Sequence, residues 1–541
     1  MKKSRLILFL FFTYYLFIPG THNCLSQSQF QLVVRDSSNS GVEARSIIQT
    51  TDGGFIAVGE SDWPGGDMYI VKLNSSGQLQ WSKTIGGSGQ DLALSVVQTT
   101  DGGFAVAGYG NSFGAGVAGP FIVKLTPGGT VEWARVLADG FLDAAYSIVQ
   151  TFDGGYAAVI STGEGGGSAR MIIVKLNNMG IMQWSKRIGG LSYARCLKQT
   201  TDRGYVVAGA TETFGAGEFD MFVVKFDSNG SLQWSKTIGG TNYDFANSIV
   251  QTTDGGYAIA GYTDSFGNAE KVYIVKLDSS GMILWTKVFS VYLDRAYSIV
   301  QTIDGGYAVA GYTGGGSGSN DGMLILKLSS EGSLQWSRKV KAGSVPTGAY
   351  SIIQTTDGGY AAAGYGGNLD AEGMFIVKLD NNGNTCGNTV SHNISVGSGG
   401  ILGSPVPTVT NISLTDTLLS PVTGSLGYVT PICVIGIQPI SYEIPASYRL
   451  YQNYPNPFNP ITLIRFDIPS ILLSSECTLR VYDMLGKEIS VLVNQSLQPG
   501  TYRVEWNGAN FASGVYYYDL SILNSGSSVE YKETKRMVLI K

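Results

Sequence analysis

A unit of about fifty residues recurs along most of the chain and constrains the fold more than any other feature. Its clearest copy runs from Ser248 to Ser290. A TDGG-type turn recurs with its aspartate at Asp52, Asp101, Asp153, Asp202, Asp254, Asp304 and Asp357, and the tryptophan of an LQW-type segment recurs at Trp81, Trp133, Trp184, Trp234, Trp285 and Trp336. A constant period of this size is typical of a stacked or circular array of one supersecondary unit.

Four short segments of each unit have the composition of β-strands. In the copy that begins at Ser248 they read SIVQT, YAIAGYT, VYIVKLD and ILWTKVF, and Gly, Asp, Asn and Ser separate them. The turns TTDGG and DSSG join the segments pairwise as hairpins, because Asp and Asn tolerate left-handed backbone and Gly readily takes positive φ. Four antiparallel strands per unit predict an all-β chain whose units are propeller blades.

The two ends of the array predict closure into a ring. The segment Phe30 to Arg35 precedes the first TDGG turn by about the distance at which each Trp strand precedes the next turn, so it resembles a fourth strand without its first three. The seventh copy, Tyr350 to Asp380, has three strands and then runs into NNGNTCGN. We therefore expect residues 27–385 to form a seven-bladed β-propeller in which Phe30 to Arg35 completes the last blade and the Trp strand is outermost, leaving no edge of a linear array open.

The first 26 residues are predicted to be a secretory signal peptide. A basic start precedes an apolar run from Leu6 to Ile18, which is too short to span a bilayer. Cys24 leaves a lipoprotein as the less favoured alternative, because the residues before it are not the small ones that lipoprotein processing requires. We expect a secreted or outer cell-surface protein that passes through the periplasm.

The composition agrees with an exported β protein. The 541 residues include 73 glycines, and only 14% are charged, against about 25% in a typical soluble domain. The formal charge of −5 predicts no strong field for nucleic acid or an anionic membrane. No later stretch is long and apolar enough to predict a transmembrane segment.

Residues 386–445 lack the repeat and are rich in Ser, Thr, Gly, Val and Pro, so we interpret them as a linker with short strands at most. Cys386 and Cys433 bracket most of this segment, and export permits a disulfide between them. Metal binding is the rival interpretation, but no CxxC or His-rich spacing accompanies these cysteines.

The last hundred residues carry five motifs in order: LYQNYPNPFNPITLIRFDIP, TLRVYDMLGKEI, PGTYRVEWNG, SGVYYYDL and ETKRMVLIK. Together they resemble the C-terminal sorting domain of type IX secretion cargo, and they are also similar to the Ig-like domain of flagellar hook-capping proteins. The resemblance implies that residues 446–541 form an Ig-like β-sandwich recognised by the outer-membrane translocon.

The resemblance also assigns the sorting signal to particular residues. The matching positions are Tyr454, Pro455, Asn456, Pro457, Gly486, Glu488, Gly500, Tyr502, Gly514, Tyr516, Lys535 and Lys541. Arg536, where the family pattern has Lys, and a longer SILLSSEC stretch are the departures, and the second affects only a loop length.

The seven copies differ from one another in two of their four connections. The TDGG and SSG turns barely change, whereas the connections after the Trp strand and between the second and third strands vary in length and content. In an up-and-down blade both variable connections emerge on one face, which is how a repeat scaffold presents a binding surface. The candidate binding residues on that face are Trp63, Asp91, Phe113, Asp143, Arg195, Phe214, Asp244, Phe266, Asp294 and Arg295; solvated loop charges are the alternative interpretation of the acids.

The sequence offers little support for catalysis or a cofactor. The histidines, His22 and His392, lie in the signal peptide and the linker, and no phosphate-binding or calcium-binding motif is present. A lysine recurs in every blade, at Lys72 in the first, which indicates an architectural role. The TxDxG turn resembles the Asp-box of sialidase-like propellers without its closing Trp, and a turn aspartate that caps backbone amides explains it better.

We therefore expect the propeller to be a binding module for an extracellular glycan or protein, delivered through the type IX translocon, with no nucleic-acid partner, metal or cofactor. Two acids at a suitable separation would suffice for a glycoside hydrolase, so a carbohydrate-active enzyme is the alternative. A purely structural surface protein is the third interpretation.

Overall fold

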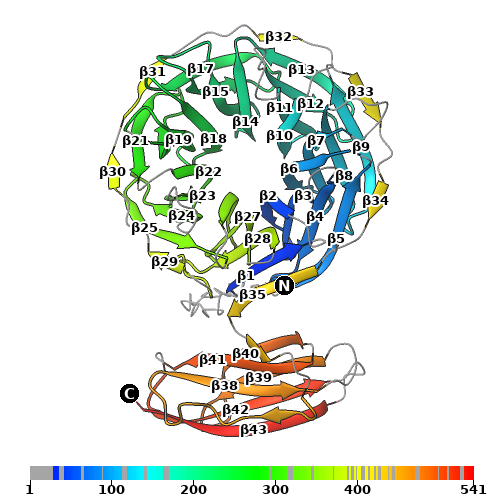
Figure 1. Ribbon diagram of the computed structural model, residues 1–541, viewed down its shortest axis with the longest axis vertical. Helices are drawn as coiled ribbons and strands as arrows, with labels where there is room; N and C mark the ends of the chain where they lie inside the picture. Colours follow the sequence, from blue (N-terminus) through cyan, green and yellow to red (C-terminus); the bar gives the residue numbers. More distant parts are fainter. Residues whose placement is uncertain are drawn as a thin grey trace, which may run out of the picture.

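The computed structural model describes residues 29–35, 42–61, 66–87, 89–111, 119–138, 143–162, 170–267, 269–290, 294–314, 321–342, 346–368, 371–386, 389–391, 395–397, 399–403, 409–411, 415–418, 422–424, 428–435, 438–441, 445–469, 475–497, 499–508, 511–523 and 529–540. All regular secondary structure in these ranges is β-strand. Figure 1 shows a ring of blades around a common centre, with a smaller two-layered body beside it. Within the described ranges, no helix is long and apolar enough to cross a membrane.

Each of the first six blades is an antiparallel sheet whose first strand is innermost in the ring (Figure 1). Blades 1 to 3 contain β2 (Val42–Gln49), β3 (Phe55–Ser61), β4 (Met68–Leu73) and β5 (Leu79–Gly86); β6 (Asp91–Gln98), β7 (Phe104–Gly110), β8 (Gly119–Leu125) and β9 (Val131–Ala138); and β10 (Asp143–Gln150), β11 (Tyr156–Thr162), β12 (Met171–Leu176) and β13 (Met182–Ile188). Blades 4 to 6 contain β14 (Ser192–Gln199), β15 (Tyr205–Thr211), β16 (Asp220–Phe226) and β17 (Leu232–Gly239); β18 (Asp244–Gln251), β19 (Tyr257–Thr263), β20 (Lys271–Leu277) and β21 (Ile283–Ser290); and β22 (Asp294–Gln301), β23 (Tyr307–Thr313), β24 (Gly322–Leu328) and β25 (Leu334–Val340).

The N-terminal strand completes the seventh blade, as the sequence predicts. Blade 7 contains β26 (Gly348–Gln354), β27 (Tyr360–Asn368) and β28 (Ala371–Leu379), and β1 (Gln29–Arg35) pairs antiparallel with β28. Phe30 lies opposite Lys378, just as Trp81 lies opposite Lys72 in blade 1, so Phe30 occupies the tryptophan position. The ring is therefore closed by main-chain hydrogen bonds between the two ends of the repeat array.

The hydrophobic core of the propeller lies between neighbouring blades. Each cluster of buried side chains combines residues of two adjacent blades, including one that joins blades 7 and 1. The tryptophan of one blade packs edge-on against the aromatic residue that opens the second strand of the next; Trp133 and Tyr156 are 5.6 Å apart between ring centroids. Phe30 makes the same contact with Phe55, at 5.8 Å, so this contact closes the ring as well.

The turns of the repeat require glycine at one position. In blade 1 the residue after Asp52 is Gly53, with φ of 80°, a left-handed conformation that L side chains seldom adopt. In blade 4 the equivalent residue is Arg203, with φ of 65°, the one non-glycine residue with positive φ in the described part of the chain. This blade therefore keeps the turn at a cost in backbone strain.

The segment predicted to be a linker forms a belt around the propeller. Its strands pair with the fourth strand of every blade, which is β1 in blade 7. They follow the order of blades 6, 5, 4, 3, 2, 1 and 7 (Figure 1). These strands are β29 (Thr389–Ser391), β30 (Ser395–Gly397), β31 (Ile401–Gly403), β32 (Val409–Asn411), β33 (Thr415–Leu418), β34 (Val422–Gly424) and β35 (Tyr428–Ile435). We use the name belt for residues 389–435.

The belt corrects one expectation from the sequence. The Trp strand is not the outermost strand, because each blade carries a fifth strand from the belt outside it. The last belt strand, β35, pairs with β1 along the whole of β1, from Gln29 opposite Ile435 to Arg35 opposite Tyr428. β1 is consequently a central strand of its sheet, and all seven of its residues are buried.

The predicted disulfide is supported at one of its two ends. Cys386 is disulfide-bonded, whereas Cys196 and Cys477 are buried free thiols. The backbone of Cys433 lies in β35 opposite Gln31, but its side chain lies outside the described residues. Pairing of Cys386 with Cys433 therefore stays a prediction, and it would fasten the start of the belt near its end.

The C-terminal body is a sandwich of two sheets. One sheet has the order β36 (Gln438–Ser441), β41 (Gly500–Asn507), β38 (Ile461–Ile468) and β37 (Arg449–Leu450); the other has the order β40 (Glu488–Leu497), β39 (Ser475–Tyr482), β42 (Gly514–Leu523) and β43 (Val529–Leu539). Residues of both sheets, Trp506 among them, form a single buried core. Trp506 is 3% exposed.

Candidate functional site

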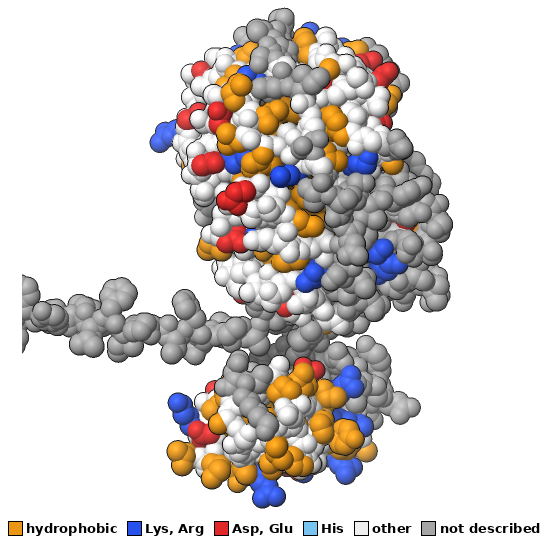
Figure 2. Space-filling model, turned by 90° about the vertical axis from the view of Figure 1, so that its left-hand side faces the viewer, with side chains coloured by type: hydrophobic (Ala, Val, Ile, Leu, Met, Phe, Trp, Pro, Cys, Tyr) orange, Lys and Arg blue, Asp and Glu red, His pale blue; other side chains and the backbone are white. Residues whose placement is uncertain are grey.

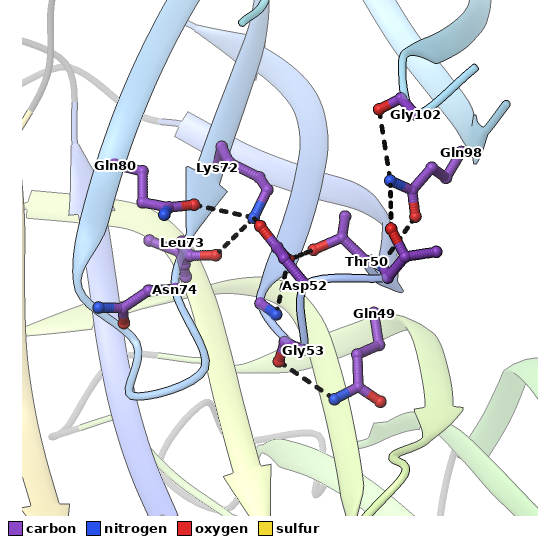
Figure 3. A network of polar contacts seen from close by, with 12 residues as sticks. Gln49, Thr50, Asp52, Gly53, Lys72, Leu73, Asn74, Gln80, Gln98 and Gly102 are labelled. Carbon is purple, nitrogen blue, oxygen red and sulfur yellow. Dashed lines mark hydrogen bonds and ion pairs between the residues drawn. The ribbon is translucent and has the colours of Figure 1, made fainter. Parts of the chain in front are cut away.

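The face of the propeller that carries the TDGG turns holds the same ion pair in every blade; we call it the constant face. In blade 1, Lys72 Nζ lies 2.9 Å from Asp52 Oδ2, and it donates to the Leu73 carbonyl oxygen at 3.1 Å and to Gln80 Oε1 at 2.9 Å (Figure 3). The lysine is buried and the aspartate is partly exposed in all seven pairs, whose N–O distances are 2.8 to 2.9 Å. The repeated lysine therefore has the architectural role predicted for it.

The turn aspartate has a lowered pKa because several donors converge on it. Partial burial opposes the shift, but hydrogen bonds from Lys72, Thr50 and the Gly54 backbone N–H outweigh it and lower the pKa of Asp52 to about 2. The carboxylate thus caps its own turn and neutralises a buried cation. The sequence analysis identified the turn aspartate and the repeated lysine separately. Because both occur in every copy, their pairing could have been predicted.

A ring of glutamines joins neighbouring blades on the constant face. Each innermost strand ends in a glutamine whose Oε1 accepts a hydrogen bond from a turn N–H of the preceding blade, at 2.8 to 2.9 Å in all seven cases. The seventh bond runs from Thr356 of blade 7 to Gln49 of blade 1. This face is uniform around the ring and has the character of a scaffold.

The opposite face carries the connections that differ between blades; we call it the variable face. The candidate residues Trp63 and Phe113 and the side chain of Asp143 lie outside the described residues. Asp91, Asp244 and Asp294 begin innermost strands, and all three side chains are 0% exposed. These acids are therefore buried, neither solvated loop charges nor groups presented to a ligand.

Asp244 shows what such an acid does. Its Oδ2 accepts hydrogen bonds from the Gly240 backbone N–H at 2.8 Å and from Ser265 Oγ at 2.7 Å. Burial raises the pKa of Asp244, and the nearby carboxylate of Asp220 raises it further, against hydrogen bonds that lower it. The carboxylate organises the connections at the start of its strand, which favours a structural role.

The structure places both candidate arginines on innermost strands of the ring. Arg295 makes a bidentate ion pair with Glu270, at 2.5 and 2.6 Å, and its guanidinium lies 4.8 Å from the ring centroid of Tyr262 in the preceding blade. Arg195 lies over Tyr146 of the preceding blade at 4.6 Å. Both come from innermost strands, β22 and β14, so these contacts lie on the inner side of the ring.

Phe214 and Phe266, the candidate phenylalanines within the described residues, lie elsewhere on the variable face. Phe214 packs against Phe222, and Phe266 packs against Tyr273, with centroid separations of 5.9 and 5.5 Å. The hydroxyl of Tyr273 donates to the Gly399 carbonyl oxygen of the belt at 2.6 Å. The Phe266 contact thus lies toward the belt on the outer side of the ring.

Sequence reasoning missed an aromatic group that spans blades 4 and 5. We call it the aromatic ladder: Tyr193, Phe219, Tyr243, Phe245 and Tyr262. Phe245 is central, with ring centroids 5.1 Å from Phe219 and 5.1 Å from Tyr262, and both pairs are nearly parallel. Tyr243 is 42% exposed, and the other rings are half-buried.

A second aromatic group continues around the inner side of the ring. Tyr297 and Tyr350, from neighbouring blades 6 and 7, have centroids 5.1 Å apart, and Tyr365 lies 5.6 Å from Tyr350. Arg45 of blade 1 lies 4.3 Å over Tyr350 and pairs with Glu43 and Glu60 at 2.8 Å each. Ring and cation–π contacts therefore link every neighbouring pair from blade 3 round to blade 1. These tyrosines occupy strand positions that hold other residues in other blades. That variation was the sequence signal that could have identified the group.

The sandwich brings the two ends of its predicted signal together. Asn456 Oδ1 accepts a hydrogen bond from the Val538 backbone N–H at 2.9 Å, and Phe458 N–H donates to the Val538 carbonyl oxygen at 2.9 Å. Tyr454, Pro455 and Pro457 are exposed beside the last strand, β43. These segments form one continuous surface, although about eighty residues separate them.

Other predicted signal residues have structural positions. Tyr502 stacks on Phe466 in the core, and the Tyr516 hydroxyl donates to the Ala512 carbonyl oxygen at 2.7 Å. Gly486 has φ of 79° in the turn before Glu488. Gly500 and Gly514 begin strands β41 and β42, Lys535 is half-buried in β43, and Lys541 lies outside the described residues.

Comparison with protein families identifies the C-terminal region. Residues 452–537 match the model of the secretion system C-terminal sorting domain. No curated protein matches the sequence.

Two solved structures with which the chain aligns have low TM-scores. The extracellular domain of a one-component system of B. thetaiotaomicron aligns over 92% of this chain and 81% of its own, at 11% identity and a TM-score of 0.23. Dimeric latent PorU from Porphyromonas gingivalis aligns over 81% of this chain and 31% of its own, at 9% identity and a TM-score of 0.15. At these TM-scores the alignments carry no conclusion about this chain. The family match does: residues 452–537 are a type IX secretion C-terminal sorting domain, and the protein is exported to the cell surface or the medium.

Proposed function

We propose that the exported propeller is a binding module that takes an extracellular ligand on the inner part of its variable face. The observation that carries this proposal is the arc of aromatic and arginine contacts from blade 3 round to blade 1. Half-exposed aromatic side chains beside a few oriented polar groups are typical of ligand sites.

The alternative of a carbohydrate-active enzyme has less support. It would need an acid and a base or nucleophile that reach a sugar. Asp91, Asp244 and Asp294, which start innermost strands, are buried, and Asp244 accepts hydrogen bonds from Gly240 and Ser265. The acids nearest the aromatic arc, such as Glu270, are engaged with arginines.

Ligand binding is tested with two exposed side chains on opposite faces. Tyr243, on the variable face, is 42% exposed, and Ile303, in a TDGG-type turn on the constant face, is 93% exposed. The protein is screened against arrays of defined glycans and extracellular proteins, and Tyr243→Ala should weaken any interaction that Ile303→Ala leaves unchanged. Equal loss in both variants, or no loss in Tyr243→Ala, would contradict the placement.

Export through the type IX translocon is tested by removing Lys535 to Lys541. These residues include Met537 and Leu539, which are buried, so the deletion disturbs the sandwich and its contact with the Asn456 segment. The propeller has separate cores, and the truncated protein should accumulate in the periplasm with the propeller folded. Fractionation that finds it outside the cell at parental levels would refute the assignment.

A further inference from the structure

Two buried carboxylates meet at the junction of blades 4 and 5, and we call them the acid pair. Asp220 begins β16 and Asp244 begins β18, and the two residues are 1% and 0% exposed. A β-carbon at Gly239, the last residue of β17, would collide with Asp220 Oδ1 and with Asp244 Oδ2. The two oxygens therefore converge on the space that this glycine leaves open.

Neutral donors hold the acid pair in place. Asp220 Oδ2 accepts the Ala216 backbone N–H at 2.9 Å. Asp244 Oδ2 accepts the Gly240 backbone N–H at 2.8 Å and the Ser265 hydroxyl at 2.7 Å. These bonds orient both carboxyl groups, but they bring no positive charge to them.

The titratable and basic groups on the neighbouring strand do not neutralise the acid pair. Tyr273 of β20 donates its hydroxyl to the Gly399 carbonyl oxygen, and burial, together with the two nearby carboxylates, raises its pKa. Lys271, which begins β20, donates to the Phe266 carbonyl oxygen at 2.8 Å. In the described part of the chain, no lysine or arginine is among the groups that shift the pKa of either carboxyl group. On the side of the molecule in Figure 2, by contrast, acidic and basic side chains are interspersed.

Two neighbouring carboxylates in a buried site cannot both ionise without a large free-energy cost, because burial weakens their hydration and each repels the other. Burial raises the pKa of Asp220 and of Asp244, and the Asp220 carboxylate raises the pKa of Asp244 further, against hydrogen bonds that lower both. One proton shared between the facing oxygens removes the repulsion and forms a short O–H···O hydrogen bond. Asp220 Oδ1 is placed to carry it, because Oδ2 accepts the Ala216 N–H.

The propeller fold does not require acids at these two positions. Asp220 pairs with the threonine that ends the second strand of blade 4, and the equivalent residue in blade 5 is Lys271. Blade 4 has Ser192 where blade 5 has Asp244. The sequence has therefore brought two acids together where the scaffold accepts a basic or a neutral residue.

The junction of blades 1 and 2 repeats the arrangement. A β-carbon at Gly86, the last residue of β5, would collide with Asp67 Oδ1 and with Asp91 Oδ2. Gly87 donates its N–H to Asp91 Oδ2 at 3.2 Å, as the equivalent glycine does to Asp244. The same geometry in two places, each with a glycine that leaves room for it, is a property of these junctions and not of one loop.

The acid pair fastens three of the variable connections. Ala216 lies between β15 and β16, Gly240 lies between β17 and β18, and Ser265 lies between β19 and β20. We propose that the acid pair holds one shared proton in the folded protein at neutral pH, and that loss of this proton to alkaline solvent separates the carboxylates and loosens the three connections. The variable face of blades 4 and 5 is then pH-sensitive, with or without a bound ligand. A divalent cation between the carboxylates is the competing explanation.

The test compares denaturant unfolding of the mature full-length protein and of Asp220→Asn between about pH 5 and pH 9. The asparagine amide is neutral throughout this range, and it can donate to Asp244 as the shared proton does. A raised folded-state pKa contributes stability that is complete below the unfolded value of about 3.9 and is lost as pH rises to the folded value. The ratio of the two folding equilibrium constants should therefore shift toward the variant by up to about tenfold per pH unit, and level off once the acid pair has lost its proton.

Two further variants sharpen the test. Asp244→Ser, which installs the residue of blade 4, should show the same trend with pH. Asp294→Asn is the matched control, because Asp294 begins β22 as Asp244 begins β18 but lies near a cation: burial and Lys341 lower the pKa of Lys339, and Asp294 raises it. Its equilibrium constant should not gain on the parent as pH rises. At about pH 8.5, hydrogen exchange of residues 212–219 and 240–243 should be faster in the parent than in Asp220→Asn.

Each other outcome overturns part of the inference. A ratio that does not change with pH in Asp220→Asn and Asp244→Ser refutes the shared proton, and this trend is readable even if a variant is less stable overall. The expected trend with equal hydrogen exchange refutes the loosening. Loss of parental stability in EDTA at neutral pH, restored by Ca²⁺ and absent in Asp220→Asn, would show that the acid pair holds a cation. Because no ligand enters these measurements, the array screen decides the proposed binding function separately.

Discussion

The two faces of the propeller use the same backbone in opposite ways. On the constant face, all seven blades repeat one aspartate–lysine pair and one glutamine hydrogen bond between blades. On the variable face, structurally equivalent positions hold Glu43, Leu92, Tyr193, Phe245 and Arg295. The residues that recur on the constant face hold the ring together. The residues that vary on the variable face are free to contact a ligand.

Acid should produce the largest effect, because it reaches every turn of the constant face at once. The folded-state pKa of Asp52, Asp101, Asp153 and Asp254 is about 2, and that of the three remaining turn aspartates is also lowered. A lowered pKa contributes stability that is complete above the unfolded value of about 3.9 and is lost as pH falls through the folded value. Denaturant midpoints should therefore fall steeply between about pH 4 and pH 2.

Three acids of the variable face act in the opposite direction. Burial raises the pKa of Asp67, Asp220 and Asp244, so their contribution is lost as pH rises through the raised values and regained on acidification. As the pH falls, the free energy of unfolding should therefore change little, or rise slightly, before the steep loss begins. A midpoint that stays constant from pH 4 to pH 2.5 would show that the turn pairs contribute nothing.

Loss of the Cys386 disulfide should be the largest effect of a single substitution. Cys386 follows the last turn of the constant face, and bonding to Cys433 would close the belt at that face. The loop-closure estimate for this pairing is about 4 kcal/mol. Non-reducing peptide mapping should find the two cysteines joined, and Cys386→Ser should lower the free energy of unfolding while Cys196→Ser, at a free thiol, does so far less. A map that joins Cys386 to another cysteine would refute the pairing.

Asp254→Ala should destabilise the protein by about 3 kcal/mol, because it leaves the buried Lys276 without its carboxylate. Asp278→Ala, in the second turn of the same blade, removes hydrogen bonds from backbone N–H groups but leaves no buried charge unpaired. It should therefore destabilise the protein less. Adding Lys276→Met to Asp254→Ala should recover part of the loss. A double variant less stable than the single one would contradict the argument.

Arg203→Gly should stabilise the protein by about 1 kcal/mol, because glycine removes the strain of a left-handed residue in the blade 4 turn. The measurement is the denaturant midpoint, with Gly102→Ala as the reverse change at the equivalent turn position in blade 2, where φ is 82°. If the two substitutions shift the midpoint in the same direction, backbone conformation does not govern this turn.

Tyr243→Ala should have the smallest effect on stability, within about 0.5 kcal/mol, because its ring is substantially exposed on the variable face. Thermal and chemical unfolding of this variant should follow the parent. A loss as large as that of Asp254→Ala would break the division between a scaffold face and a ligand face.

Several features of the fold could be predicted from the repeat, and others could not. The TDGG and SSG turns indicated the hairpins, and the missing fourth strand of the last copy indicated closure by β1, which the pairing of Phe30 with Lys378 confirms. The aromatic ladder was not predicted, because Phe219 and Tyr243 lie in connections between strands, where no periodic pattern indicates which rings will meet. Arg195 and Arg295 were identified, but their aromatic partners were not.

The sequence by itself determined the blades, their number and their hairpin turns, because each depends on local patterns of apolar residues, glycine and aspartate that recur with a fixed period. It also determined the sorting domain, whose motifs occur in order. Only the tertiary structure decided the path of the belt. Strands such as β31 (Ile401–Gly403) and β34 (Val422–Gly424) attach to the blades through main-chain hydrogen bonds, which almost any residue can make, so their composition indicates no partner. Only the closed ring provides the seven open strand edges to which the belt attaches.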